Sequence, residues 1–119
     1  MIIIRDSDIL EEPMKEEGVE KVLRRVLIGP EQGSENIIMR YFTILPGGNT
    51  PYHSHSHEHV VKIEKGKGIV VEERGRENIV SEGQSLLVEG SKEHQFKNPY
   101  YKPFEFLCII LNQEKSSFR

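Results

Sequence analysis

Short β-forming segments separated by glycine and proline turns run through the whole chain, and they constrain the fold more than any other feature. Turn residues return roughly every 8 to 12 positions, the spacing of a sandwich or barrel. No stretch shows the apolar period of a stable helix, and the acidic segment 6–18, which contains Pro13, is expected to be a loop. The sequence therefore predicts an all-β, antiparallel sandwich or barrel. The expected strands are 2–4, 19–28, 37–45, 60–64, 69–73, 78–80, 85–88, 94–96 and 104–111.

Three turns are expected to set the order of these strands. Pro46-Gly47-Gly48 is expected to end the strand before it as a turn. The segment 65–68, Lys-Gly-Lys-Gly, has the composition of a hairpin turn joining the strands on either side, and 73–76 begins a second hairpin. The polar tail 112–119 is expected to be frayed.

Four of the five histidines fall within seven residues, 53–59, and neutral imidazoles can share a divalent metal. The alternative is a solvated histidine-rich loop that binds metal only incidentally. On a straight strand His53 and His55 point to one face with α-carbons about 6.6 Å apart, so both rings can reach one ion through bonds of about 2.1 Å. The spacing therefore favours a metal site.

His59 can join that site only if the chain turns, because on a straight strand it would lie about 20 Å from His53. A turn between His55 and His59 would put His57 and Glu58 near its tip. His57 is expected to face solvent, with a proton shuttle as the alternative. Glu58 is expected to be solvated, or else to orient a ligand ring. This set of three histidines needs a fourth ligand from elsewhere.

Length and charge exclude several classes of protein. The 119 residues are expected to form one domain, residues 1–119, that buries a core without disulfides. A single cysteine fits a reducing cytoplasm, and no signal peptide or apolar run of membrane length is seen. The net charge of −3 gives no reason to expect nucleic acid. Charged residues at 29% with no tryptophan suggest a thermophile.

Two segments resemble the motifs of the cupin family. The first, residues 47–66, reads Gly47, His53, His55 and Gly66 at the family spacing, with His59 where glutamate is usual. The second, residues 83–98, begins at Gly83 and carries His94 and Asn98; it departs from the family pattern by having Glu89 in the proline position and Gly90 one place early. The resemblance implies a single-domain jelly-roll β-barrel whose metal ligands are His53, His55, His59 and His94.

The resemblance is strongest to small four-histidine cupins, and it implies a homodimer with one divalent metal ion per chain. Manganese is the first expectation, and iron, nickel, cobalt, copper and zinc remain alternatives. Four neutral imidazoles leave the site with a formal charge of +2, which favours an anionic, chelating ligand. Six-coordinate metals would keep two positions for water or substrate, whereas four-coordinate zinc would form a closed structural site.

Four further residues are candidates for the wall of the cavity. Cys108 lies on one strand face with Phe106, where it is either a small core residue or a thiol lining the pocket. Phe96 and Phe106 are expected to be apolar wall residues, with core packing as the alternative. Arg40 interrupts an apolar strand, and it either stands at the rim with its head in water or binds an anion.

These observations favour a metal-dependent oxidoreductase, similar to a dioxygenase, that uses oxygen or peroxide on a small organic substrate. The first alternative is an isomerase or decarboxylase in which the ion acts as a Lewis acid. The second is a non-catalytic ligand-binding module with a structural metal. The sequence does not identify the substrate, and one fold of this type supports many activities.

Overall fold

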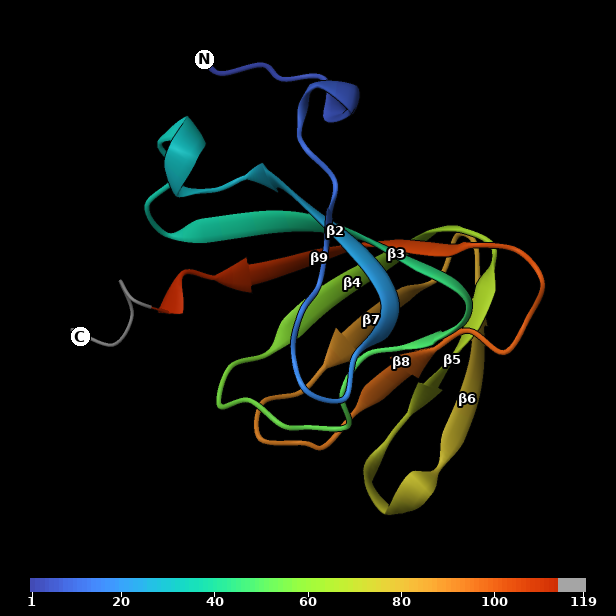
Figure 1. The fold of residues 1–119 in the computed structure, drawn as a ribbon. Coiled ribbons are helices and arrows are strands. Elements are labelled where there is room, and N and C mark those ends of the chain that lie inside the picture. Colours follow the sequence, from blue (N-terminus) through green and yellow to red (C-terminus); the bar gives the residue numbers. More distant parts are fainter. Residues whose placement is uncertain (114–119) are drawn as a thin grey trace.

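The computed structural model describes residues 1–113, in which antiparallel strands form a curled sheet with the shape of a half-barrel (Figure 1). The strands are β1 (Glu12–Pro13), β2 (Glu20–Ile28), β3 (Ile37–Asn49), β4 (His59–Lys65), β5 (Lys67–Val71), β6 (Glu77–Ser81), β7 (Ser85–Val88), β8 (Gln95–Lys97) and β9 (Phe104–Leu111). Three short 3-10 turns lie at Asp6–Asp8, Pro30–Gln32 and Glu73–Gly75. None of them is long and apolar enough to cross a membrane. The all-β prediction is confirmed.

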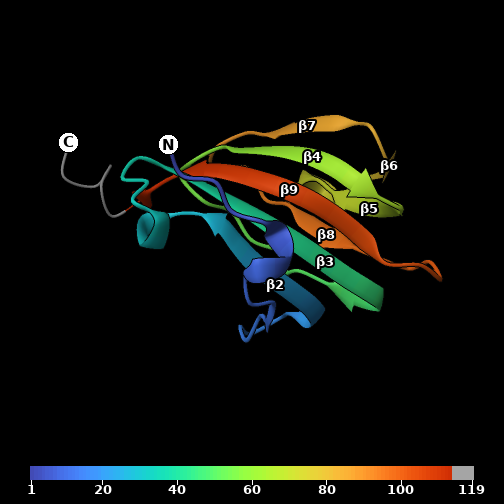
Figure 2. The same cartoon turned by 90° about the horizontal axis from the view of Figure 1, so that it is seen from above.

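The sheet runs in the order β6-β5-β8-β3-β9-β4-β7, and β2 pairs with β3 over residues 39–49. The long strand β3 joins both halves, because it pairs with β9 over Ile37–Ile44 and with β8 at Asn49. Figures 1 and 2 show the β5–β6 hairpin at one end of the sheet and β2, β3, β9, β4 and β7 across the rest. The curl leaves a concave face between these halves, as expected of a jelly roll.

Strict alternation along β9 fixes which side chains face the core. Phe104, Phe106 and Cys108 are buried, while the residues between them are partly exposed. Such a period of two is what a strand with one buried face requires. Phe106 packs against the rings of Phe42 and Phe96, with centroids 5.3 and 4.7 Å apart. The core cluster consists of Val22, Phe42, Ile44, Val61, Ile63, Val70, Val80, Val88, Phe96, Phe104, Phe106 and Cys108.

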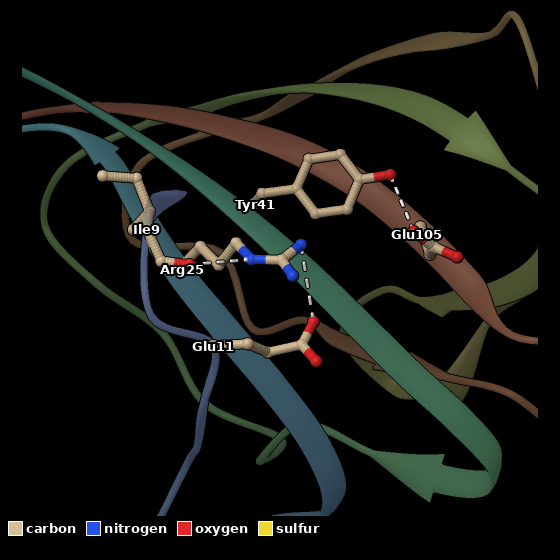
Figure 3. Close-up of polar contacts among 5 residues, drawn as sticks. All are labelled: Ile9, Glu11, Arg25, Tyr41 and Glu105. Carbon is tan, nitrogen blue, oxygen red and sulfur yellow. Dashed lines mark hydrogen bonds and ion pairs between the residues drawn. The ribbon is translucent and has the colours of Figure 1, made fainter. Parts of the chain in front are cut away.

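The convex face of the sheet carries polar side chains that find partners (Figure 3). Arg25 on β2 donates its Nε–H to the carbonyl of Ile9 at 3.2 Å and pairs with the Glu11 carboxylate at 3.6 Å. Tyr41 on β3 donates its hydroxyl to Glu105 on β9 at 2.8 Å. Burial, and then this carboxylate, raise the pKa of Tyr41, so the phenol stays protonated. The two contacts of Arg25 hold the segment before β1 against the sheet, and the Tyr41–Glu105 bond joins β3 to β9.

Two local predictions are wrong. Residues 2–4 form no strand, because no strand among the described residues pairs with them, and Ile2 and Ile3 are exposed. Pro46-Gly47-Gly48 does not end β3, which continues to Asn49. Instead the register against β2 shifts there, and Gly47 takes a φ of 85°. The glycines bend the strand so that it passes from β9, its partner up to Ile44, to β8 at Asn49, while Glu20 of β2 still pairs with Asn49.

The predicted hairpin at 65–68 is also wrong, although a turn lies there. β4 pairs with β7 and β9, whereas β5 pairs with β6 and β8. The chain therefore crosses from one half of the sheet to the other at Gly66, which has a φ of 73° and packs against the backbone of Pro103. The second predicted hairpin is confirmed, because β5 and β6 pair across Glu73–Gly75. Part of the expected frayed tail, residues 114–119, lies outside the described residues.

Candidate metal centre and its cavity

Two segments far apart in the sequence bring the histidines together. An isolated antiparallel bridge joins His53 to His94, through hydrogen bonds of 3.1 Å from the His53 amide and 2.9 Å from the His94 amide. A second backbone hydrogen bond joins the same two segments, because the amide of Ser91 donates to the carbonyl of His55. Next to it, Gly90 lies so close to Ser56 that a β-carbon would come within 2.6 Å of the carbonyl oxygen. The backbone thus positions the rings.

Three rings present nitrogens to one point. One ring nitrogen each of His53, His55 and His94 lies within 4.8 Å of the other two, and the Nε2 atoms of His53 and His55 are 3.1 Å apart. His94 Nδ1 lies 2.9 Å from the carbonyl oxygen of Lys92. Because a carbonyl only accepts, Nδ1 must carry the hydrogen, which leaves the Nε2 lone pair free. This orientation of a ring by a backbone carbonyl is typical of metal-binding histidines.

His59, at the start of β4, lies beside these three rings. Its ring centroid is 5.1 Å from that of His55 and 5.4 Å from that of His94. Its Nδ1 is 3.3 Å from Cys108 Sγ, while its Nε2 is buried without a hydrogen-bond partner. The chain therefore turns between His55 and His59 as predicted, with bends at Ser56 and His57. His59 does not belong to the closest group of three, and its Nε2 needs a partner.

His57 and Glu58, the two residues expected at the tip of the turn, differ in their exposure to solvent. His57 is half-buried, and its ring stacks on those of His55 and His59 with both centroid distances at 4.9 Å. The expectation of a solvent-facing residue is thus wrong for His57, because its ring packs on two neighbouring imidazoles. Glu58 is exposed, and it makes no hydrogen bond to a ring within the described residues.

A cavity of about 110 Å³, with room for several water-sized groups, is lined by His53, His55, His59 and His94. Its wall also includes every aromatic, arginine and cysteine candidate predicted from the sequence: Arg40, Phe96, Phe106 and Cys108. Further lining residues that the sequence analysis missed are Met14, Glu16, Arg24, Phe42, Thr50 and Pro51. Phe42 could have been found, because it lies two residues from Arg40 and so shares its face. Arg24 depends on the register between β2 and β3, which no local pattern shows.

Arg40, Cys108 and His59 form a connected group in the wall. Arg40 donates from Nη2 to Cys108 Sγ at 3.2 Å, and its guanidinium lies 5.0 Å from the centre of the Phe42 ring. The Nε of Arg40 is buried without a partner. Burial raises the pKa of the Cys108 thiol, although the guanidinium acts against this. The thiol is therefore protonated at neutral pH and lies within reach of a cavity ligand.

The imidazoles are held neutral. Burial first, and then the neighbouring rings and Arg40, lower the pKa of His55 to about 4. Burial first, and then Arg40 and the other rings, lower the pKa of His59 to about 3. The pKa of His53 is also lowered, by burial and by His94, with Glu16 acting against the shift. Neutral imidazole is the form that binds a metal. Ring spacing, tautomer and protonation all fit a divalent ion, and the free Nε2 of His59 fits a fourth ligand.

Comparison with known proteins agrees with the architecture. The cupin domain family, Cupin_2, matches residues 40–110. The 1-methylthio-D-xylulose 5-phosphate methylsulfurylase of Rhodospirillum rubrum is 33% identical over 72 residues, 60% of this chain and 46% of that protein. The chain therefore spans about half the length of this curated relative.

Two solved structures superimpose closely on the fold. The polyketide cyclase RemF from Streptomyces resistomycificus has a TM-score of 0.89 at 25% identity, over 93% of this chain and 79% of that one. A cupin-2 domain protein from Rhodospirillum rubrum has a TM-score of 0.79 at 28% identity, over 92% and 74% of the two chains. Both similarities extend beyond residues 40–110 to most of the chain.

Proposed function

The chain belongs to the cupin family, and we propose that it is a metal-dependent enzyme that acts on a small organic anion. One observation carries the proposal: the imidazole cluster and the guanidinium of Arg40 line the same small cavity. A cation at the imidazoles and the arginine would together favour an anionic ligand. The lining of Phe42, Phe96 and Phe106 would keep water away and strengthen both interactions.

His53, His55 and His94 would hold the ion, with His59 as the fourth ligand through its free Nε2. The mutual spacing of the first three and the lone buried nitrogen of His59 support this set. We propose manganese as the native ion, with iron, nickel, cobalt, copper and zinc as alternatives. When bound, the ion would act as a Lewis acid that polarises an oxygen of the ligand. Arg40 would bind and orient the anion, and the neutral imidazoles would leave the charge of the ion uncompensated.

The site supports a non-oxidative reaction best, such as an isomerisation, a lyase reaction or a decarboxylation. Cys108 lies 3.3 Å from His59, where chemistry with oxygen would expose the thiol to oxidation. The relatives with 25% identity or more whose activity is stated above are a methylsulfurylase and a cyclase, neither named as an oxygenase. Both points favour polarisation of a bound anion over the activation of oxygen.

A second candidate is the dioxygenase-like or peroxide-using oxidoreductase predicted from the sequence. The stacked rings of Phe96 and Phe106, 4.7 Å apart at the cavity wall, favour it because oxygen enters apolar surroundings readily. With four imidazole ligands, a six-coordinate ion would keep two positions for other ligands, as this chemistry requires.

Elemental analysis of untagged protein, followed by assays with small hydroxy- and oxo-acids with and without oxygen, separates the candidates. Metal-dependent loss of substrate under argon supports the non-oxidative reaction, whereas oxygen uptake coupled to substrate loss supports the oxidoreductase. Chelator-treated protein is the control. Protein that binds an anion but converts none of the acids would instead support the non-catalytic module, and protein without metal affinity would contradict the proposal.

We also propose that the protein is a homodimer in the cytoplasm. Apolar side chains lie side by side on the convex face of β7, β4 and β9, where Leu87 is 59%, Val60 49% and Ile109 38% exposed. An apolar row across three strands favours contact with another protein surface. Light scattering at micromolar concentration tests the dimer, and a monomer mass would contradict it.

A further inference from the structure

We propose that Arg24 and Arg40 form a second anion-binding site in the cavity wall, so that the substrate carries a phosphate group besides the group held at the imidazole end. The inference rests on the proposed function for the imidazole end only. The arginine pair itself is independent of any metal. Nothing in the histidine motifs points to Arg24.

The register between β2 and β3 puts both arginines on the concave face. Arg24 lies opposite Phe42, and Arg40 is two residues from Phe42 on the same strand. The two arginines are therefore diagonal neighbours, whose β-carbons are about 7–8 Å apart or somewhat less in an antiparallel pair. Each side chain is long enough to bring its guanidinium to an anion between them. Both residues line the cavity.

No ion pair among the described residues compensates the charge of this arginine pair. The exposed Glu12 lies opposite Arg24 in the β1–β2 register, but it is outside the lining of this cavity. The ion pairs among the described residues involve Arg25, Arg76 and Lys97, and neither Arg24 nor Arg40 is in one. Arg40 has a buried Nε without a partner, and its bond to Cys108 uses a weak acceptor. A buried polar group without a partner is rare enough to require an explanation. An anion from outside the chain would supply the missing acceptors.

Glu16 is the single carboxylate among the lining residues, and it lies exposed on the loop before β2. It makes no ion pair with either arginine. Two guanidiniums against one exposed carboxylate leave this wall with an excess of positive charge. The excess favours a dianion over a single carboxylate.

Phosphate fits the pair better than a second carboxylate does. A phosphate monoester has three acceptor oxygens and a charge near −2, whereas a carboxylate has two oxygens and one charge. Each guanidinium has five N–H donors in a planar fork that matches phosphate oxygens. Two such forks converging from adjacent strands would leave donors unused on a carboxylate.

Calorimetric titration of the manganese-loaded full chain with glycerate and with 3-phosphoglycerate tests the inference. The two probes share the α-hydroxycarboxylate that can chelate a metal, and they differ in the phosphate at the other end. We expect the phosphate to tighten binding about tenfold to a hundredfold in the unaltered protein. Arg24→Gln should remove most of that gain and leave glycerate binding unchanged. Arg24→Lys should keep part of it, because the charge remains without the fork.

Arg25→Gln is the matched control, because it removes the same charge one residue along β2, where the side chain faces outward (Figure 3). It should bind both probes as the unaltered protein does. Equal affinity for glycerate and 3-phosphoglycerate would overturn the inference. So would equal losses in Arg24→Gln and Arg25→Gln, or a gain of the same size when malate replaces 3-phosphoglycerate.

Chelator-treated protein separates a failure here from a failure of the proposed function. Inorganic phosphate should bind the metal-free chain and bind about tenfold more weakly to Arg24→Gln. If manganese does not bind but this difference persists, the proposed function fails and the arginine site stands. If manganese and glycerate bind but phosphate binds equally to both proteins, the arginine site fails and the proposed function stands.

Discussion

Arg24 and Arg25 are neighbours on one strand, but they face opposite sides of the sheet and have opposite surroundings. Arg25 on the convex face is bonded to the Ile9 carbonyl and to Glu11. Arg24 on the concave face lines a cavity without an ion pair. The same residue type is thus satisfied where it stabilises the fold and left available where a ligand can bind.

The contrast extends to the two faces as a whole. Among the described residues, the buried side-chain nitrogens and oxygens without a partner are Arg40 Nε and His59 Nε2, and both residues line the cavity. On the convex face Tyr41 and Glu105 bond to each other. A buried polar atom without a partner requires an explanation, and a ligand bound in the cavity would supply one for both atoms.

Truncation of a concave-face core residue should have the largest effect. Phe104 is fully buried on β9, and Phe104→Ala should lower the free energy of unfolding by about 3–5 kcal/mol, because it leaves a cavity in the core. Ile79→Ala on β6, where the Ile79 side chain points away from the core and is 66% exposed, should cost less than about 1 kcal/mol. Ile79 lies outside the apolar row proposed as the dimer surface. Urea unfolding measures both losses, and equal losses would contradict this difference between the core and the outer face.

Loss of one imidazole should remove the metal, whereas loss of its stacking neighbour should not. His55→Ala takes away one of three mutually close ring nitrogens and should weaken metal affinity by at least about a hundredfold. His57→Ala removes a ring that stacks on His55 but does not line the cavity, and it should retain the metal. Competition with a chelator measures the affinities. Equal metal loss in both variants would contradict the proposed ligand set.

The spacing of the histidines predicted much of the local geometry of the site. It required a turn between His55 and His59, and the structure has one. The resemblance to the cupin motifs added His94, which no local pattern connects to His53. Alternation along 104–111 placed Cys108 and Phe106 on one face, as observed. Whether that face lined a cavity could not be decided, because the answer depends on the other half of the sheet.

The failures share a cause, which is that strand pairing is decided over long distances. The segment 65–68 has the composition of a hairpin turn, but β4 pairs with β7 and β9 and not with β5, the next strand in the sequence. The glycines at 47 and 48 bend β3 from one partner to another instead of ending it. Arg24 entered the site through the same kind of register, which local composition does not encode.

Acid should destabilise the metal-free protein through the cavity and not through the convex face. An unfolded histidine titrates near 6.5, whereas the pKa of His55 is lowered to about 4 and that of His59 to about 3. Above pH 6.5 both states are neutral and there is no contribution. As the pH falls from 6.5 to 4, the unfolded chain takes up protons that the folded chain does not. The free energy of unfolding should therefore fall in this window.

Urea unfolding of chelator-treated protein at pH 7.5, 6 and 5 measures this loss, which should be on the order of 2 kcal/mol by pH 5 because the rings are only partly buried. His55→Gln should flatten the curve, since glutamine does not titrate. A midpoint that stays constant or rises between pH 7.5 and 5 would show that the rings are solvated in the folded chain.

Replacing an arginine on each face gives the smallest effect and the sharpest comparison, because the two changes should have opposite signs. Arg40→Met removes a guanidinium with an unsatisfied buried Nε and keeps most of the volume beside Phe42, so it should raise the free energy of unfolding by about 1 kcal/mol. The same variant should bind 3-phosphoglycerate more weakly. Arg25→Met removes the contacts to Ile9 and Glu11 and should lower the free energy of unfolding by about 1 kcal/mol, with binding unchanged.

A loss of stability in Arg40→Met as large as that in Arg25→Met would contradict this comparison. It would mean that Arg40 stabilises the fold, so that the convex face with its paired side chains and the concave face with its binding groups would not differ at this residue.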